Sequence, residues 1–176
     1  GNSCAGGFVS VSGQSIVFDA VTAGTTVDLT APGAAPSGEA ILGNAITAGG
    51  DVTLNAASIR INDGVTTTAS VRATATGGAI NMPVDAGGNV LINASGNIGG
   101  SFVSGGNIAL TAGGSITAQA VATGGYIDPL NVNAIPAEGI VVIAAAGDAN
   151  ILANSGATTM FGVSAGTNAN VNGVTA

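Results

Sequence analysis

The sequence contains no histidine, lysine or tryptophan, and its 176 residues include one cysteine and five aromatic side chains. Without histidine, the chain cannot form a Ser-His-Asp triad, a Cys-His pair or a histidine metal ligand. Without lysine, it has no P-loop lysine, Schiff base or Ser-Lys dyad. Cys4 has no partner for an internal disulfide, and its role stays open between a free thiol, an intermolecular bridge and an inert side chain. These absences exclude much of the side-chain chemistry that enzymes use.

Charge is also scarce, because two arginines and nine carboxylates are the only charged residues and give a formal net charge of −7. Two cations cannot neutralise a phosphate backbone, so we expect no nucleic-acid partner. The longest apolar run, residues 140–146, is too short for a transmembrane segment. A chain rich in Ala, Gly, Thr and Asn with so little charge favours a secreted protein or a protein of the bacterial cell surface.

The apolar content argues for a folded chain, since 46% of the residues are hydrophobic and the mean hydropathy is +0.56. A disordered chain normally has the opposite balance of apolar and charged residues. The β-branched residues Val, Ile and Thr number 51, whereas aromatic residues number five, and this bias favours strands over helices. The length suits one domain.

One sequence pattern recurs: two glycines, then Asp or Asn, then an alternation of apolar and polar residues that ends in Ala. Its clearest copies are residues 49–56, 87–94 and 105–112. The interval between the first two copies is about twice the interval between the last two, as expected if one unit between them is degenerate. The repeat therefore predicts similar structural units of about 19 residues each.

Each clear copy is followed, seven or eight residues after its first apolar residue, by a second short apolar segment that begins at Ile59, Ile98 or Ile116. A unit of short strands cannot bury its apolar face alone, but units stacked about 4.8 Å apart can. The pattern therefore predicts a parallel β-helix with apolar rows inside and Thr and Asn rows outside. We expect the Gly-Gly pairs at corners that need positive φ or a close approach between coils.

These repeats resemble those of filamentous haemagglutinin-type adhesins, over roughly residues 46–120. The resemblance rests on the unit Gly-Gly-[Asp/Asn]-[Val/Ile]-x-[Leu/Ile]-x-Ala and its Gly-x-Ile partner. Proteins of that family are secreted by the two-partner pathway of Gram-negative bacteria and form long right-handed parallel β-helices. The resemblance implies an all-β, right-handed parallel β-helix (a β-solenoid) and a role at the cell surface, but no site.

We expect residues 1–176 to form a single β-helix domain with three parts. Residues 1–45 contain N-terminal strands and a Pro-containing loop, residues 46–120 form regular coils, and residues 121–176 form irregular coils and a tail. The predicted strands outside the repeats are 8–11, 15–18, 27–29 and a fully buried strand at 140–143. The irregular connections are predicted at 31–39 and 128–139. Four phenylalanines are expected at or near the irregular parts, where they could cap the stack or fill wider coils: Phe8, Phe18, Phe102 and Phe161.

The candidate catalytic residues are nine carboxylates: Asp19, Asp28, Glu39, Asp51, Asp63, Asp85, Asp128, Glu138 and Asp148. Hydrolysis of a glycosidic bond needs two carboxyl groups about 5 to 9.5 Å apart, and Asp51 with Asp28 or Asp85 is the pair to consider. Most of these Asp residues occupy turn positions, where the side chain bonds its own backbone. We therefore predict no catalytic, cofactor-binding or metal-binding residue and no cofactor.

Other polar motifs have simpler structural interpretations. The segments 62–64 and 147–148 suggest turns, and the Gly-Gly-x-Gly-x-Asp calcium repeat is absent. The threonines of 66–68 and 74–76 do not continue as a Thr-x-Thr row, so we favour a solvated strand surface over an ice-binding face. Arg60 and Arg72 flank Asp63 and suggest a weak surface ion pair. Asn55 and Asn93 share one slot of the repeat and could form an amide ladder.

The sequence thus predicts a non-catalytic protein, a structural or adhesive rod of an extracellular bacterial surface protein. The alternative is a self-assembling subunit of an extracellular filament or surface layer that stacks through its β-helix ends. In that alternative the N-terminal strands between Phe8 and Phe18 pair across the junction. The expected partners are further copies of the chain, end to end, or a host or cell-surface ligand. A β-helical polysaccharide enzyme and an ice-binding module rank below these two.

Overall fold

The structure is a computed structural model, and it describes residues 1–33, 38–122, 139–145, 149–152, 158–165 and 168–172. These residues form strands and their connections, with no helix among them. The strands are β1 (Ser3–Ala5), β2 (Val9–Ser12), β3 (Ile16–Val17), β4 (Ala20–Ala23), β5 (Val27–Ala31), β6 (Ile41–Ala48), β7 (Val52–Ala56), β8 (Ile59–Thr67), β9 (Val71–Ala75), β10 (Ile80–Asn81), β11 (Val84–Ala86), β12 (Val90–Ala94), β13 (Ile98–Ser104), β14 (Ile108–Ala112), β15 (Ile116–Ala122), β16 (Gly139–Ala145), β17 (Ala149–Leu152), β18 (Thr158–Ala165) and β19 (Ala169–Asn172).

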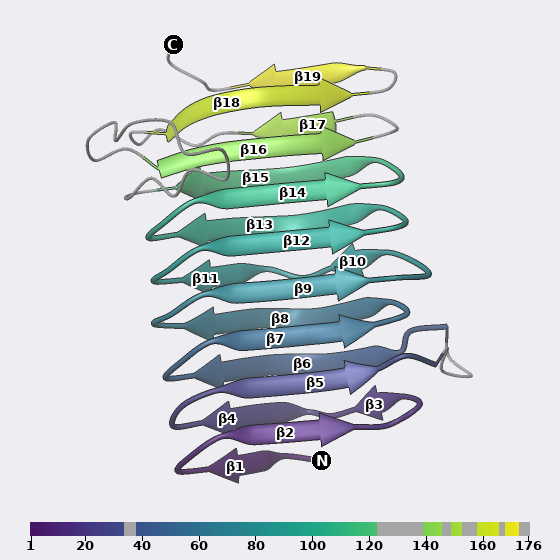
Figure 1. The fold of residues 1–176 in the computed structure, drawn as a ribbon, viewed down its shortest axis with the longest axis vertical. Coiled ribbons are helices and arrows are strands. Elements are labelled where there is room, and N and C mark those ends of the chain that lie inside the picture. Colours follow the sequence, from purple (N-terminus) through teal and green to yellow (C-terminus); the bar gives the residue numbers. More distant parts are fainter. Residues whose placement is uncertain (34–37, 123–138, 146–148, 153–157, 166–167, 173–176) are drawn as a thin grey trace.

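Two parallel sheets face each other, and the chain alternates between them (Figure 1). We call the 11-stranded sheet, which runs from β1 to β19, sheet A, and the eight-stranded sheet, which runs from β2 to β18, sheet B. The near strands run to the right and the distant strands to the left while the chain climbs, so the path is right-handed. About six turns of roughly 19 residues are continuous through residue 122. The predicted all-β, parallel β-solenoid is confirmed.

The register places side chains of the same kind above one another in successive coils. In sheet B, one inward column pairs Val27 with Val52, Val52 with Val71 and Val71 with Val90. A second inward column is alanine, which explains the Ala that ends each repeat. The alanine column comprises Ala31, Ala56, Ala75, Ala94 and Ala112.

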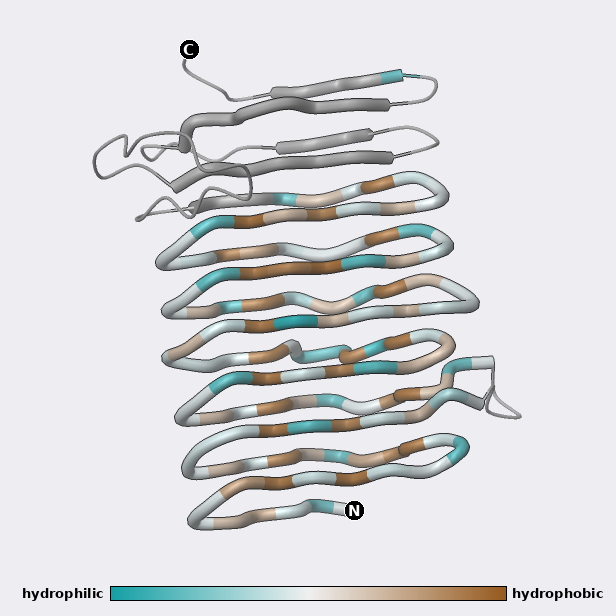
Figure 2. The backbone as a smooth tube through the Cα atoms, viewed as in Figure 1, coloured by the Kyte–Doolittle hydropathy of each residue, from teal (hydrophilic) through white to brown (hydrophobic). Residues whose placement is uncertain are grey.

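Sheet A has its own column of buried isoleucines, which begins its rungs from β3 to β15. Burying a large aliphatic side chain contributes about 1.5–3 kcal/mol, so these columns provide the main stabilising force between coils. Figure 2 shows the apolar positions recurring at matching places along the stack. The isoleucine column comprises Ile16, Ile41, Ile59, Ile80, Ile98 and Ile116, each at most 8% exposed.

The corner glycines allow close approach between coils. A Cβ atom on Gly49 would lie 2.2 Å from the carbonyl oxygen of Gly24, and one on Gly105 would lie 2.2 Å from that of Gly87. Neither distance is compatible with a side chain. The positive φ angles lie elsewhere among the described glycines, at Gly38, Gly64 and Gly100. Of the two roles expected for the Gly-Gly corners, close approach is the one observed there.

Two sequence expectations need correction. Residues 62–64 are not a turn: they lie within β8, where Asn62 and Asp63 oppose Asn44 alone and form a β-bulge. Phe102 does not lie near an irregular part, because it is fully buried within β13 of the regular coils.

The strands expected outside the repeats are present. The segments 8–11, 15–18, 27–29 and 140–143 correspond to β2, β3, β5 and β16. Most of the predicted connection 128–139 lies outside the described residues. The turn expected at 147–148 also lies outside them.

Candidate functional site

Six of the nine carboxylates lie among the described residues, and three of these six accept a hydrogen bond from within the chain. Asp51 accepts one from the backbone N–H of Ser70 at 3.0 Å, and Asp19 accepts one from the Asn44 amide at 2.7 Å. Asp28 accepts a long bond from the Thr30 hydroxyl at 3.5 Å. The others are Glu39, Asp63 and Asp85, while Asp128, Glu138 and Asp148 lie outside the described residues.

The three carboxylates that the sequence made candidates for a catalytic pair lie on different parts of the coil. Asp28 is exposed on β5 of sheet B, and Asp85 is exposed on β11 of sheet A. Asp51 lies at the corner between the sheets, immediately before β7. Its bond to the next coil gives it a structural task.

That task is repeated at the same corner of successive coils. The Asp51 carboxylate accepts the N–H of Ser70, and the Ser70 hydroxyl accepts the N–H of Asn89 at 3.1 Å. The Asn89 amide oxygen in turn accepts the N–H of Asn107 at 2.9 Å. Each corner side chain therefore pairs a backbone donor one coil further on, which explains the Asp or Asn that follows each Gly-Gly.

A second polar chain crosses the outer face of sheet A. Arg60 Nε donates to Asn62 Oδ1 at 3.2 Å, Asn62 Nδ2 donates to Asn44 Oδ1 at 2.9 Å, and Asn44 Nδ2 donates to Asp19. In each of these three bonds the donor lies on the side of Arg60 and the acceptor on the side of Asp19. The predicted ion pair involved both arginines, but Arg72 lies in sheet B, on β9. No local sequence pattern predicts this series of hydrogen bonds, because its members come from three different coils.

The proposed ladder of Asn55 and Asn93 is interrupted. Both residues point outward in one column of sheet B, but the register places Thr74 between them. A threonine column does occur on sheet A, where Thr22, Thr47 and Thr66 are neighbours in successive coils. It continues into an Asp and a Val, so it forms no repeated Thr-x-Thr surface among the described coils.

A hollow of about 520 Å³ lies where this column meets the Gly-Gly corner. Its outward side chains include Thr47, Thr66, Asp85 and Val103, from four successive coils. It thus presents two hydroxyls, one carboxylate and one apolar side chain. Hydrolysis by paired carboxylates needs a second acid, and Asp85 is the only acid among the described residues that line this hollow.

Metal ligands and membrane-spanning helices are the remaining features to consider in the described part of the chain. Within it, no three side chains among His, Cys, Asp and Glu gather closely enough to hold a metal ion. That same part holds no helix with the length and apolar character needed to cross a bilayer. Cys4 is exposed on β1, beside Thr22.

The described residues define a β-solenoid of two parallel sheets, in which side chains of successive coils form aligned columns. Compared with known proteins, the chain matches no family model, no curated protein and no solved structure.

Proposed function

We propose that the chain is a rod segment of an extracellular bacterial surface protein, with a structural or adhesive role and no catalytic activity. The observation that carries this proposal is the repetition of the same buried columns through about six continuous turns. Each coil stacks on its neighbours alone, so the length of such a rod is set by the number of coils. The resemblance of residues 46–120 to filamentous haemagglutinin-type repeats supports the same role.

The polar groups support a structural interpretation as well. The corner side chains of Asp51, Ser70 and Asn89 pair backbone donors of the next coil. The Asp51 carboxylate used in this way stabilises coil stacking. The outer rows of sheet B consist mainly of Ser, Thr and Asn, which gives the rod an outer face of nearly constant cross-section.

Deleting one complete coil tests the rod. Removal of residues 90–107 joins Asn89 to Ile108, which occupies the same column as Val90. We expect a cooperatively folded protein that is shorter by about 4.8 Å, measured by small-angle X-ray scattering and thermal unfolding. Removal of residues 90–98 is the matched control, because half a coil places the following strands in the wrong sheet. Equal stability of the two deletions would contradict the rod.

The adhesive and non-catalytic parts of the proposal need their own measurements. Binding of the fluorescently labelled chain to bacterial and animal cells, followed by flow cytometry, tests adhesion. Incubation with polysaccharides, followed by an assay for reducing ends, tests catalysis, and we expect no release. Reducing ends that disappear with Asp51→Asn would contradict the non-catalytic assignment.

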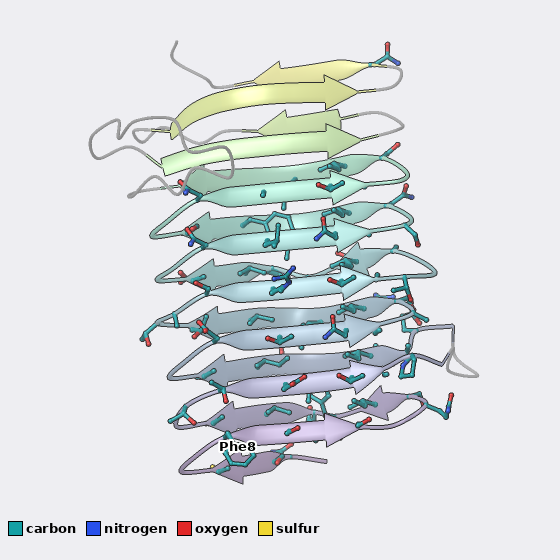
Figure 3. The ribbon with its side chains drawn as sticks, viewed as in Figure 1. Phe8 is labelled. Carbon is teal, nitrogen blue, oxygen red and sulfur yellow. The ribbon has the colours of Figure 1, made fainter. Side chains whose placement is uncertain are left out.

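A second candidate function is end-to-end stacking into an extracellular filament or surface layer. It is favoured by apolar side chains on the coil nearest the N-terminus: Phe8 is 68% exposed (Figure 3), and Val11, which shares the inward column of Leu29, is 40% exposed. A neighbouring coil would cover these side chains, whether it came from a second copy or from the same protein. Negative-stain electron microscopy with light scattering distinguishes the two functions. Long fibres that Phe8→Asp abolishes would favour stacking, whereas a stable short rod would favour a segment of a larger protein.

A further inference from the structure

The outer face of sheet B has a symmetric arrangement of charge. Its strands β2, β5, β7, β9, β12 and β14 present two outward columns to solvent. One column contains Asp28, Thr53 and Arg72 on three successive coils. These two charges are the only ones in the two columns of these strands; the other residues are Ser10, Leu91, Ala109, Ser12, Thr30, Asn55, Thr74, Asn93 and Thr111.

The two charges have little compensation within the chain. Both side chains are exposed, and two coil spacings of about 4.8 Å separate their backbones. The Asp28 carboxylate accepts only the 3.5 Å bond from Thr30 among the described residues. The Arg72 guanidinium makes no hydrogen bond or ion pair with another described residue, whereas Arg60 on sheet A bonds to Asn62.

We propose that two copies of this chain pair face to face through the outer faces of their B sheets, with their stacking directions antiparallel. A two-fold axis that lies in the interface, parallel to the strands and level with Thr53, exchanges the coil below with the coil above. It therefore places Asp28 of each copy opposite Arg72 of the other, and Thr53 opposite itself. A two-fold interface requires such self-complementarity, because the same surface serves on both sides.

The neighbouring positions suit the same arrangement. The rotation sets Asn55 of one copy opposite Asn55 of the other, where two amides can donate and accept reciprocally. In the charged column it places Leu91 over Ser10, and within the two columns it brings no two like charges together. The two Asp51 carboxylates lie at the exposed edge of the interface, where water screens their repulsion. Such a face, made mostly of Ser, Thr, Ala and Asn, can pack against a second sheet about 10 Å away.

Charge reversal tests the pairing. Arg72→Asp sets an acid against Asp28 twice per dimer, and we expect the dimer dissociation constant to rise by about 100-fold. Sedimentation equilibrium over a concentration series measures this constant, and circular dichroism checks folding. Arg60→Asp is the matched control: it makes the same change on sheet A and should leave the dimer intact. The exchange Asp28→Arg with Arg72→Asp should restore dimerisation.

Cross-linking tests the position of the axis. In a Cys4→Ser background, Thr53→Cys should join two copies through a short bis-maleimide linker. Thr111 lies three coils further along the stack, so the axis separates its two copies by six coil spacings, and Thr111→Cys should not be joined. Sedimentation as a monomer at every concentration would overturn the proposal. A dimer that survives Arg72→Asp, a charge exchange that fails to restore pairing, or equal cross-linking at both cysteines would also overturn it.

Discussion

The two sheets of the solenoid are built from the same coils, but they differ in regularity. In sheet B, each complete coil from β5 to β14 contributes one five-residue strand, and no register shift interrupts the pairing. In sheet A, the equivalent rung is split into β3 and β4, bulged between β6 and β8, and split again into β10 and β11. One side of the coil is therefore kept constant while the other absorbs variation.

The variation in sheet A lies between its isoleucine column and a second buried column, which contains Val65, Val84 and Phe102. The step from Ile59 to Val65 in β8 is longer than the step from Ile98 to Phe102 in β13, although both pairs occupy the same two columns. The shorter step recurs on both neighbouring rungs, between Ile80 and Val84 and between Ile116 and Ala120, so the longer step of β8 is the exception. Coils of unequal length are thereby accommodated without disturbing sheet B.

A one-residue insertion should have the largest effect and should show the clearest difference in tolerance between the two sheets. An alanine inserted between Ile92 and Asn93 turns the rest of β12 over, so that its outward residue faces the core. We expect this variant to lose cooperative folding. The same insertion between Gly100 and Ser101 in sheet A should leave a folded protein with a modest loss of stability, because β8, two coils away, already holds two more residues between the same columns.

Thermal unfolding followed by circular dichroism measures both insertions. Equal loss of the unfolding transition in the two variants would show that sheet A is no more tolerant than sheet B.

Glycine substitutions should have the next largest effect. Gly105→Ala places a Cβ atom 2.2 Å from the Gly87 carbonyl oxygen at the corner that leads into sheet B. We expect a loss of about 1–3 kcal/mol in the free energy of unfolding, the usual cost of overpacking. Gly99→Ala on sheet A meets only the Asn81 side chain, at 3.4 Å, and should be neutral or slightly stabilising. Urea denaturation compares them, and a Gly99 variant as unstable as the Gly105 variant would contradict the close-approach argument.

Substitutions in the two series of polar hydrogen bonds, at the corner and on sheet A, should show the smallest difference in stability. Asn89→Ala removes the acceptor of the Asn107 backbone N–H at the corner, and we expect a loss of about 1 kcal/mol. Asn44→Ala breaks the chain on the outer face of sheet A, where water can replace the lost bonds, and should cost less. Urea denaturation at equal salt measures both. A larger loss for Asn44→Ala would mean that the chain from Arg60 to Asp19 acts as a unit.

The difference in regularity between the two sheets also decides how much of the fold the sequence could predict. The readable repeat is the corner plus the strand of sheet B, so the inward positions of Val52, Leu54, Val90 and Ile92 follow from alternation alone. Sheet A offers only its leading isoleucines as a regular signal. The turn predicted at residues 62–64 is wrong because Asn-Asp-Gly is a local turn signature, whereas the strands that hold it extended lie on adjacent coils.

The sequence predicts the kind of role that the polar side chains have, but not the residues to which they bond. A turn role for Asp51 follows from its place after Gly-Gly, yet its acceptor role toward Ser70 depends on the stacking register. The chain from Arg60 to Asp19 also needs residues one coil apart to meet, and the coil between Asp19 and Asn44 is longer than the others in the repeat. Single-sequence reasoning finds the period and does not find exceptions to it.

The ladder hydrogen bonds of both sheets run along the stacking direction, and this gives the molecule a characteristic mechanical response. A force that pulls the two ends of the stack apart loads the bonds of one terminal coil at a time, as in opening a zipper. Each released coil of about 19 residues adds roughly 60 Å of extended chain. Single-molecule extension should therefore proceed in nearly equal steps at similar force, and the protein would behave as an extensible tether that limits the load on whatever it connects.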